Sequence, residues 1–283
     1  MAVKWRVSRA GPIMVTGMRR ICLAALAIVP VVFGQAQGSS PSEPPQHPSF
    51  GLQDPSILQR NVGKKPELGK AGPAPRLADG KPDLTGPWEP NAINLNVNMK
   101  ASGIQIPFSP QGEALYKSRL ANLGKDDPEA RCLPPGVPRL TTTPYPFRFV
   151  QMPNYIAILY EGGTHTWRQI FMDGRKFSQF AEDLWNGESI GHWEGDTLVV
   201  ESTGFNDKTW IDAAGVPHST QLKVVERFHR LDADNMEVEN IIDDPVMYTK
   251  PWSFTTYPKR LKGELMEYIC NENEQDVKHL QGK

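Results

Sequence analysis

The sequence predicts an all-β fold, an antiparallel meander that closes into an up-and-down barrel or a strongly curled sheet. From residue 147 onward, short segments rich in β-branched and aromatic residues follow one another, with turn signals between them. These segments are 147–151, 155–161, 165–172, 188–193, 196–203, 222–231, 235–242, 252–257 and 264–270. A meander of this length usually closes on itself, because closure removes the unpaired edges of the sheet.

Turn residues separate the predicted strands. The dipeptides Asp173-Gly174 and Asn186-Gly187 are typical of tight hairpin turns, and Asp232–Asn235 forms another corner. Gly195-Asp196 is a two-residue connection between segments 189–193 and 197–203. Its neighbour Glu194 and Asp196 itself are therefore predicted to be turn residues that face solvent, in preference to a catalytic acid pair.

One helix is predicted before the strands, and it packs against the sheet together with proline-rich coil. Ser109 is an N-cap candidate, Pro110 suits the first helical position, and Gly124 suits the C-terminal stop. Tyr116, Leu120 and Leu123 form the apolar stripe of this helix. The segment 132–147, CLPPGVPRLTTTPYPF, is predicted to be coil that follows a surface.

The N-terminal part of the chain predicts export. Met18-Arg19-Arg20 precedes an apolar run and then small residues suited to cleavage, so residues 1–36 are identified as a signal peptide. Residues 37–82 are predicted to be a disordered Pro/Gly-rich leader, 83–275 a single β-rich domain, and 276–283 a C-terminal tail. The apolar run is too short for a membrane span. We therefore expect a periplasmic or extracellular protein without a stable membrane anchor after cleavage.

Charge and motifs exclude several function classes. Removal of residues 1–36 takes five of the 31 basic residues and none of the 32 acidic ones, which leaves a net charge of −6. The remaining basic residues are not clustered, so no nucleic-acid partner is predicted. Phosphate-binding loops, dinucleotide fingerprints, nucleophile elbows and metal-ligand spacings are missing from the sequence, so neither a cofactor nor a metal is predicted. The sequence makes no prediction of the oligomeric state.

Two cysteines follow the predicted signal peptide, Cys132 and Cys270. Two cysteines in an oxidising compartment most simply form a disulfide. Two free thiols, or a pair of metal ligands, are the alternatives.

Glu226 is the principal catalytic candidate. In strand 222–231 it shares the apolar row with Leu222, Val224 and Phe228. A carboxyl group buried in this way gains a raised pKa, the condition that a general acid needs. The alternatives are a structural salt bridge to an inward arginine, or a change of strand phase through a bulge.

Two histidines and an arginine are further candidates. His192 is predicted to share an inward face with Ile190, and His165 to share a face with Trp167 and Phe171. Each imidazole could relay a proton or bind a ligand, and each could equally be a satisfied structural residue. Arg168 is placed as a clamp for an anionic ligand or substrate, with a plain surface position as the alternative.

The long connection 204–221 is the predicted place for a ligand site over the barrel mouth. It contains Phe205, Asp207, Trp210 and His218, and long ordered loops are often lids or binding loops. The alternative is an ordinary compact loop that packs Phe205 and Trp210 on the barrel.

From about Asp83 to Cys270 the chain resembles an uncharacterised family of secreted bacterial proteins. The resemblance rests on LADGKPDLTGPW, DDPEARCLPPGVPR, RQIFMDGR, GHWEGDTLVVESTGFNDKTWID, GVPHSTQLKVVERF and DDPVMYTKPW. It implies membership of the family but no activity. The family pattern ends in Cys-His-Glu-Gly, where this chain has Cys270-Asn271-Glu272-Asn273. Separately, LTGPW at the start of a meander is similar to the Gly-x-Trp opening of lipocalin-like barrels, which implies such a barrel here.

Two functions follow from these observations. The first is an exported β-barrel that binds a small, partly apolar molecule, since small barrels commonly hold ligands. The second is a periplasmic lyase, isomerase or hydrolase that uses general acid–base chemistry centred on Glu226, with His192 or His165 as its partner. A closed salt bridge at Glu226 would favour the first hypothesis.

Overall fold

The computed structural model describes residues 65–68, 71–164, 166–178, 183–270 and 272. Contacts divide the chain into two units, residues 1–48 and 49–283, and every described residue belongs to the second unit. The predicted signal peptide, most of the predicted leader, His165 and the predicted tail lie outside the described residues. Within the described ranges, none of the helices has the length and apolarity that a membrane span requires.

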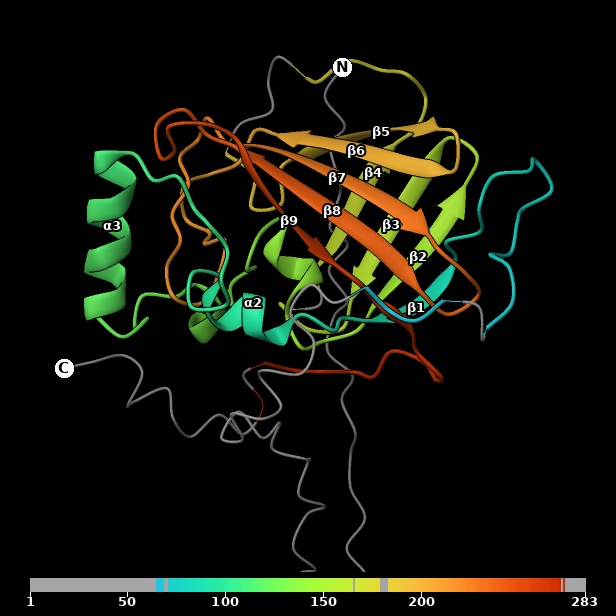
Figure 1. The fold of residues 1–283 in the computed structure, drawn as a ribbon, viewed down its shortest axis with the longest axis horizontal. Coiled ribbons are helices and arrows are strands. Elements are labelled where there is room, and N and C mark those ends of the chain that lie inside the picture. Colours follow the sequence, from blue (N-terminus) through green and yellow to red (C-terminus); the bar gives the residue numbers. More distant parts are fainter. Residues whose placement is uncertain (1–64, 69–70, 165, 179–182, 271, 273–283) are drawn as a thin grey trace, which may run out of the picture. The chain divides into compact units, whose positions relative to one another are not determined.

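A ten-stranded curled sheet dominates the described part of the chain and confirms the predicted all-β class (Figure 1). Its spatial order is β10-β1-β2-β3-β4-β5-β6-β7-β8-β9. The strands are β1 (Gly86–Glu89), β2 (Phe147–Met152), β3 (Tyr155–Tyr160), β4 (Trp167–Phe171), β5 (Glu188–Glu194), β6 (Thr197–Thr203), β7 (Lys223–Arg230), β8 (Met236–Asp243), β9 (Trp252–Thr256) and β10 (Lys259–Arg260). Apart from β10, spatial order follows chain order, as in a meander.

The chain after β9 partly closes the curl. Met236 N, at the start of β8, donates to Pro258 O at 3.0 Å, and Arg260 N donates to Asp234 O at 2.7 Å. Lys259 and Arg260 themselves form β10, which pairs with β1 at the other end of the sheet. Residues 257–261 therefore bring the two edges together near the start of β8. The sheet is a half-closed barrel.

The concave face of the sheet carries the hydrophobic core. Alternate residues of each strand point inward, so β2, β3 and β7 each bury every second side chain. Fully buried core residues on the strands include Trp88, Phe147, Phe149, Ile158, Leu198, Val200, Val224, Phe228, Val238 and Ile242. Because Glu226 occupies the same row as Val224 and Phe228, the predicted inward position of Glu226 is confirmed.

Among the described residues, two helices accompany the sheet, α2 (Ile93–Asn98) and α3 (Pro110–Ala121), with two short 3₁₀ turns, η1 (Glu129–Arg131) and η2 (Arg139–Thr141). The predicted N-cap of α3 is confirmed, since Gly112 N donates to Ser109 Oγ at 3.0 Å. The predicted apolar stripe is correct only for Tyr116, because Leu120 and Leu123 are exposed.

The packing of α3 explains this difference. The helix comes close to the backbone of Met247 at Gly112, where an added Cβ would lie 2.2 Å from Met247 O. A glycine permits this close approach of two backbones. The buried face therefore runs through Gly112 and Tyr116, one turn earlier than the apolar pattern suggests.

The connection between β4 and β5 differs from the prediction. These strands are parallel, so the segment between them is a crossover and does not form the predicted hairpins. Gly174 and Gly187 do adopt positive φ, but each forms a local bend within the crossover. The Asp-Gly and Asn-Gly dipeptides form local turns only. The connection is long enough for the chain to run back along the sheet, so that β5 starts in the same direction as β4.

Two other segments differ as well. Residues 264–270, predicted as a strand, do not form one and are irregular up to a turn at Cys270. Residues 71–82 of the predicted disordered leader form an ordered turn, in which Leu77 N donates to Lys81 O at 2.9 Å. Arg76 pairs with Asp196 at 2.5 Å, and this contact fastens the turn to the β5–β6 hairpin. Asp196 is thus the predicted turn residue, with an ion-pair partner that the sequence did not indicate.

Candidate functional site

Glu226 and Arg168, two of the predicted site residues, form an ion pair inside the sheet. Glu226 comes from β7 and is 0% exposed, while Arg168 comes from β4 and is 2% exposed. Arg168 Nη1 lies 2.5 Å from Glu226 Oε2. For Glu226, the sequence left a structural salt bridge to an inward arginine as one alternative, and the structure has this arrangement.

Two serines and Tyr160 also surround the guanidinium. Arg168 Nε donates to Ser189 Oγ of β5 at 2.9 Å, and its Nη2 donates to Ser202 Oγ of β6 at 2.6 Å. Four consecutive strands, β4 to β7, therefore contribute to one polar cluster. Small side chains at Ser189 and Ser202 leave room for the arginine to cross the interior.

The electrostatics of the cluster favour a closed structural pair. Burial raises the pKa of the Glu226 carboxyl above its usual range, and the nearby positive charge of Arg168 opposes this rise. A general acid must reach its substrate. Glu226 is completely buried, and it is not among the residues that line either pocket described below.

His192 does not join this cluster, and the predicted inward face of His192 is wrong. Its side chain is 50% exposed, and Nε2 lies 3.3 Å from Glu194 Oε1 on the outer face of β5. The inward residues of β5 are Ser189, Gly191 and Trp193, which packs against the core. Gly191 is packed so closely that an added Cβ would lie 2.5 Å from Met172 Sδ. Ile190, which suggested the phase, is on the outer face.

Trp167, the other predicted residue of β4, points away from the buried ion pair. Trp167 is 53% exposed on the outer side of the sheet. A pocket of about 400 Å³ is lined by Trp167 and Arg168 together with Phe171, Asn186 and Ser189. The Nε and Nη2 groups of Arg168 donate to the two serines, and Nη1 meets Glu226, so the guanidinium is held by the protein.

The loop 204–221 is a packed structural loop. Phe205, Trp210 and His218 are buried, and Asp207 is exposed. Asp212 holds the loop, since its carboxylate accepts from Met99 N at 2.8 Å and from Val216 N at 3.0 Å. The alternative of a compact loop packed on the sheet therefore describes this segment better than a lid.

His218 is buried in its neutral form within this loop. Nε2 lies 2.6 Å from Thr209 Oγ1, and Nδ1 lies 3.1 Å from the carbonyl oxygen of Ser219. Since a carbonyl can only accept, Nδ1 carries the proton and Nε2 accepts from the threonine. Burial lowers the pKa of His218 below its usual range.

We expect His218 to make the protein less stable in mild acid. In the unfolded chain, the His218 imidazole takes up a proton below about pH 6.5. In the folded chain, its lowered pKa keeps the imidazole neutral to a lower pH, so stability is lost as the pH falls through this window. Between about pH 7.5 and 5.5, the wild type should therefore lose about 1 kcal/mol more of its unfolding free energy than His218→Gln does. Urea denaturation at both pH values measures the change. The exposed His192→Gln is the control, and an equal effect of both variants would contradict the expectation.

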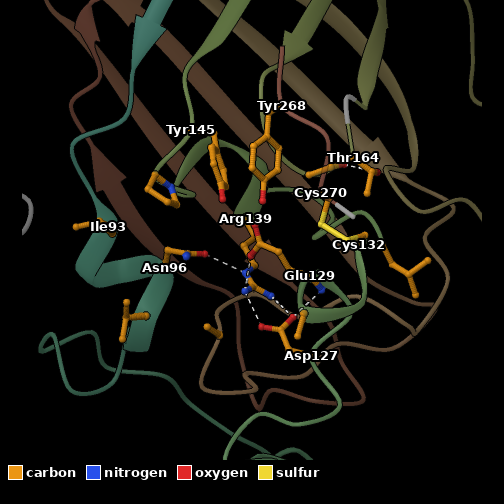
Figure 2. A pocket seen from close by; sticks show the side chains of 16 residues that line it. Ile93, Asn96, Asp127, Glu129, Cys132, Arg139, Tyr145, Thr164, Tyr268 and Cys270 are labelled. Atoms are coloured by element: carbon orange, nitrogen blue, oxygen red, sulfur yellow. Dashed lines mark hydrogen bonds and ion pairs between the residues drawn. A yellow bond between two sulfur atoms is a disulfide. The ribbon is translucent and has the colours of Figure 1, made fainter. Parts of the chain in front are cut away.

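A pocket of about 320 Å³ lies beside the disulfide and brings together residues from separate segments (Figure 2). We call it the disulfide pocket. Its lining residues are Ile93, Asn96, Val97, Asp127, Glu129, Ala130, Cys132, Leu133, Arg139, Pro144, Tyr145, Gly163, Thr164, Ala213, Tyr268 and Cys270. They come from α2, η1, η2, the proline-rich coil, the β3–β4 turn, the 204–221 loop and the C-terminal segment.

Arg139 is the charged centre of the disulfide pocket. Its side chain is 1% exposed, and it donates from Nη1 and Nη2 to the two oxygens of Asp127 at 2.7 and 2.8 Å. Nη2 also donates to Glu129 Oε2 at 2.7 Å, and Nε to Asn96 Oδ1 at 2.9 Å. The forked contact with Asp127 is the strong bidentate geometry of arginine. Although burial alone would lower it, the pKa of Arg139 is raised by these carboxylates, so the guanidinium stays charged.

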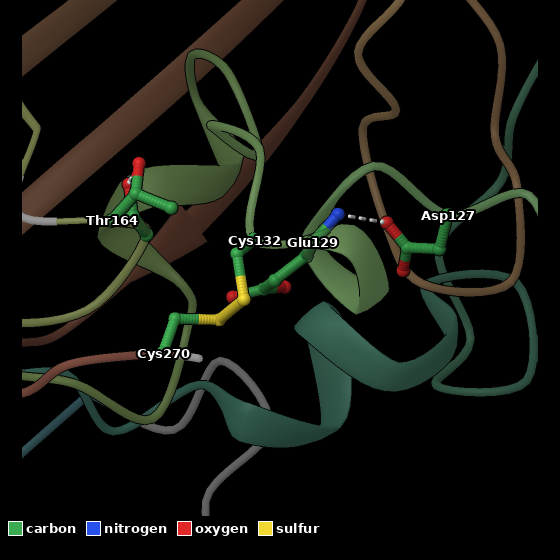
Figure 3. The surroundings of a disulfide bond; sticks show 6 residues. Asp127, Glu129, Cys132, Thr164 and Cys270 are labelled. Carbon is green, nitrogen blue, oxygen red and sulfur yellow. Dashed lines mark hydrogen bonds between the residues drawn. A yellow bond between two sulfur atoms is a disulfide. The ribbon is translucent and has the colours of Figure 1, made fainter. Parts of the chain in front are cut away.

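Two tyrosines and the disulfide form another wall of the pocket. The rings of Tyr145 and Tyr268 lie 5.0 Å apart between centroids, and their hydroxyl ends point toward the side where Arg139 lies (Figure 2). Cys132 and Cys270 form the predicted disulfide (Figure 3), and both cysteines line the pocket together with Glu129. Met266 N donates to Glu161 Oε2 at 2.8 Å. The disulfide and this hydrogen bond flank Tyr268 in sequence and hold it in place.

The sequence reasoning did not identify Arg139, Tyr145 or Tyr268 as site residues. One signal was present, because Asp127 and Glu129 lie within five residues of Cys132, and Tyr268 lies two residues before Cys270. A predicted disulfide brings its flanking residues together, so these neighbours were candidates. In the part of the chain that is described, no group of three or more His, Cys, Asp or Glu side chains is arranged to hold a metal ion.

Comparison of the chain with family models, with curated proteins and with solved structures gives no match.

Proposed function

We propose that this protein is exported and binds a small, partly apolar molecule in the disulfide pocket. The observation that carries the proposal is the pocket of about 320 Å³, whose walls combine apolar and aromatic side chains with a buried charged cluster. Small-molecule sites are usually concave, mostly apolar and equipped with a few polar groups that fix orientation. The volume lies at the lower end of the usual range, which suits a ligand with one ring.

The rigidity of the walls supports this proposal. Arg139 is fixed by Asn96, Asp127 and Glu129, and Tyr268 is held beside the disulfide. A preformed site loses less conformational freedom when its ligand binds. Export is supported by the disulfide, since such bonds persist in oxidising compartments.

An enzyme centred on Glu226 receives less support. The carboxyl group is closed by Arg168 and has no exposure, so a substrate could not reach it without a rearrangement of β4 or β7. His192, its proposed partner, points outward on β5. We therefore favour binding over acid–base catalysis.

Filling the pocket tests the proposal. We expect a library of one-ring fragments, screened by ligand-observed NMR, to give ligands that bind the wild type with one site per chain. Ala130→Trp, which places an indole in the pocket, should weaken them at least about tenfold through loss of space. Ala101→Trp is the matched control, because Ala101 is exposed and does not line the pocket. Fragments that bind all three proteins equally, or an absence of ligands, would contradict the proposal.

A further inference from the structure

The charges that line the disulfide pocket are unbalanced. Arg139 is the one basic residue among the sixteen lining residues, and it faces the carboxylates of Asp127 and Glu129. With both carboxylates ionised, the lining carries a net charge of −1. A negative charge in a mostly buried cluster favours a positively charged ligand, because the attraction between charges is stronger away from bulk water.

Arg139 has little left to offer an anion. Four of its five N–H groups donate to Asn96, Asp127 and Glu129, which leaves one N–H group on Nη1. An anionic ligand there would gain one hydrogen bond and would meet the repulsion of two carboxylates. A ligand that is positively charged and donates hydrogen bonds meets no such repulsion.

The pocket is rich in groups that accept hydrogen bonds or attract cations. Glu129 Oε2 already accepts from Arg139, so Oε1 is the oxygen that a ligand would use. The hydroxyl ends of Tyr145 and Tyr268 point toward the same side of the pocket (Figure 2). Tyrosine faces also attract ammonium groups through their ring electrons.

We infer that the disulfide pocket selects a small organic amine, with its ammonium group bound to Glu129 and the tyrosine pair and its apolar part against Leu133 and Ile93. This inference rests on the proposed function and names the class of ligand for the same site. Burial raises the pKa of the Glu129 carboxyl, and the positive charge of a bound ammonium would offset that cost.

Three probes of similar size separate the effect of charge from the effect of shape: benzylamine, benzyl alcohol and benzoate. Titration of the wild type at neutral pH, followed by NMR or calorimetry, should show benzylamine binding at least about tenfold more tightly than benzyl alcohol, the scale of one charge-assisted hydrogen bond. Benzoate should bind more weakly than both. Equal or tighter binding of benzoate or benzyl alcohol, or no binding of benzylamine at millimolar concentration, would overturn the inference.

A variant pair tests the residue that carries the charge. Glu129→Gln should abolish the preference for benzylamine over benzyl alcohol, and circular dichroism with urea denaturation checks that the variant is folded. Asp126→Asn, the matched control, removes an exposed carboxylate that pairs with Arg131 and does not line the pocket, and it should keep the preference. A preference that survives Glu129→Gln would overturn the inference.

The two proposals fail in different ways. If Ala130→Trp leaves the binding of all three probes unchanged, they do not occupy the disulfide pocket, and the proposed function falls with the inference. If Ala130→Trp weakens all three probes but they bind with equal affinity to the wild type, the pocket binds small molecules without selecting amines. Only the inference is then overturned.

Discussion

Replacing Glu226 by Gln is expected to lower the free energy of unfolding by about 3–5 kcal/mol. The substitution keeps the size of the side chain but leaves the charge of Arg168 buried without its partner, whose Oε2 lies 2.5 Å from Nη1. A guanidinium does not lose its proton in a protein, so it cannot escape this cost by becoming neutral. Urea denaturation followed by circular dichroism measures the loss.

Further variants identify the cause of that loss. The double variant Arg168→Met/Glu226→Gln should recover much of the stability, because a neutral interior replaces an isolated charge. Glu113→Gln breaks the exposed pair with Lys117, at 2.8 Å, and should have no measurable effect. If Glu226→Gln proved as harmless as Glu113→Gln, the buried pair would not support the fold in the way we describe.

Removing the disulfide is the second change with a large expected effect. Cys132 and Cys270 are separated by 138 residues, and a cross-link over a loop of that length stabilises by about 5 kcal/mol in the chain-entropy model. We expect Cys132→Ser/Cys270→Ser to lose stability on this scale, measured by urea denaturation under oxidising conditions.

A reductant supplies the control for this experiment. Reduced wild type should approach the stability of the double serine variant, and the serine variant itself should not respond to the reductant. A wild type whose stability is the same in oxidising and reducing buffer would contradict the expectation. Because Cys270 lies close to Tyr268, the same reduction should also loosen one wall of the disulfide pocket.

The fold was largely predictable because the strand period is a local property of the chain. Alternation placed Glu226 in the buried row of β7 correctly, and Ser109 marked the start of α3. The phase of β5 was wrong because two of its inward residues, Ser189 and Gly191, are small, and the apolar Ile190 faces outward. Small residues on an inner face leave no hydrophobic pattern, and here they make room for the neighbouring Arg168 and Met172.

The site was less predictable because it is assembled from distant segments. Arg168 and Glu226 could each be proposed, but the sequence left open whether they meet. The disulfide pocket combines residues from Ile93 to Cys270, and only the cysteine pair linked them in advance. Likewise, the crossover before β5 could not be distinguished from a hairpin, since both begin with the same turn dipeptides.

The parallel contact between β4 and β5 gives the sheet an internal seam. It consists of two residue pairs, Ile170 with Ser189 and Phe171 with Ile190, while the ladders on either side are longer and antiparallel. Arg168 crosses this seam to reach Ser189, Ser202 and Glu226. In mechanical terms the seam is one of the two shortest pairings in the sheet, the other being that of β1 with β10, and a single buried guanidinium ties its two sides together.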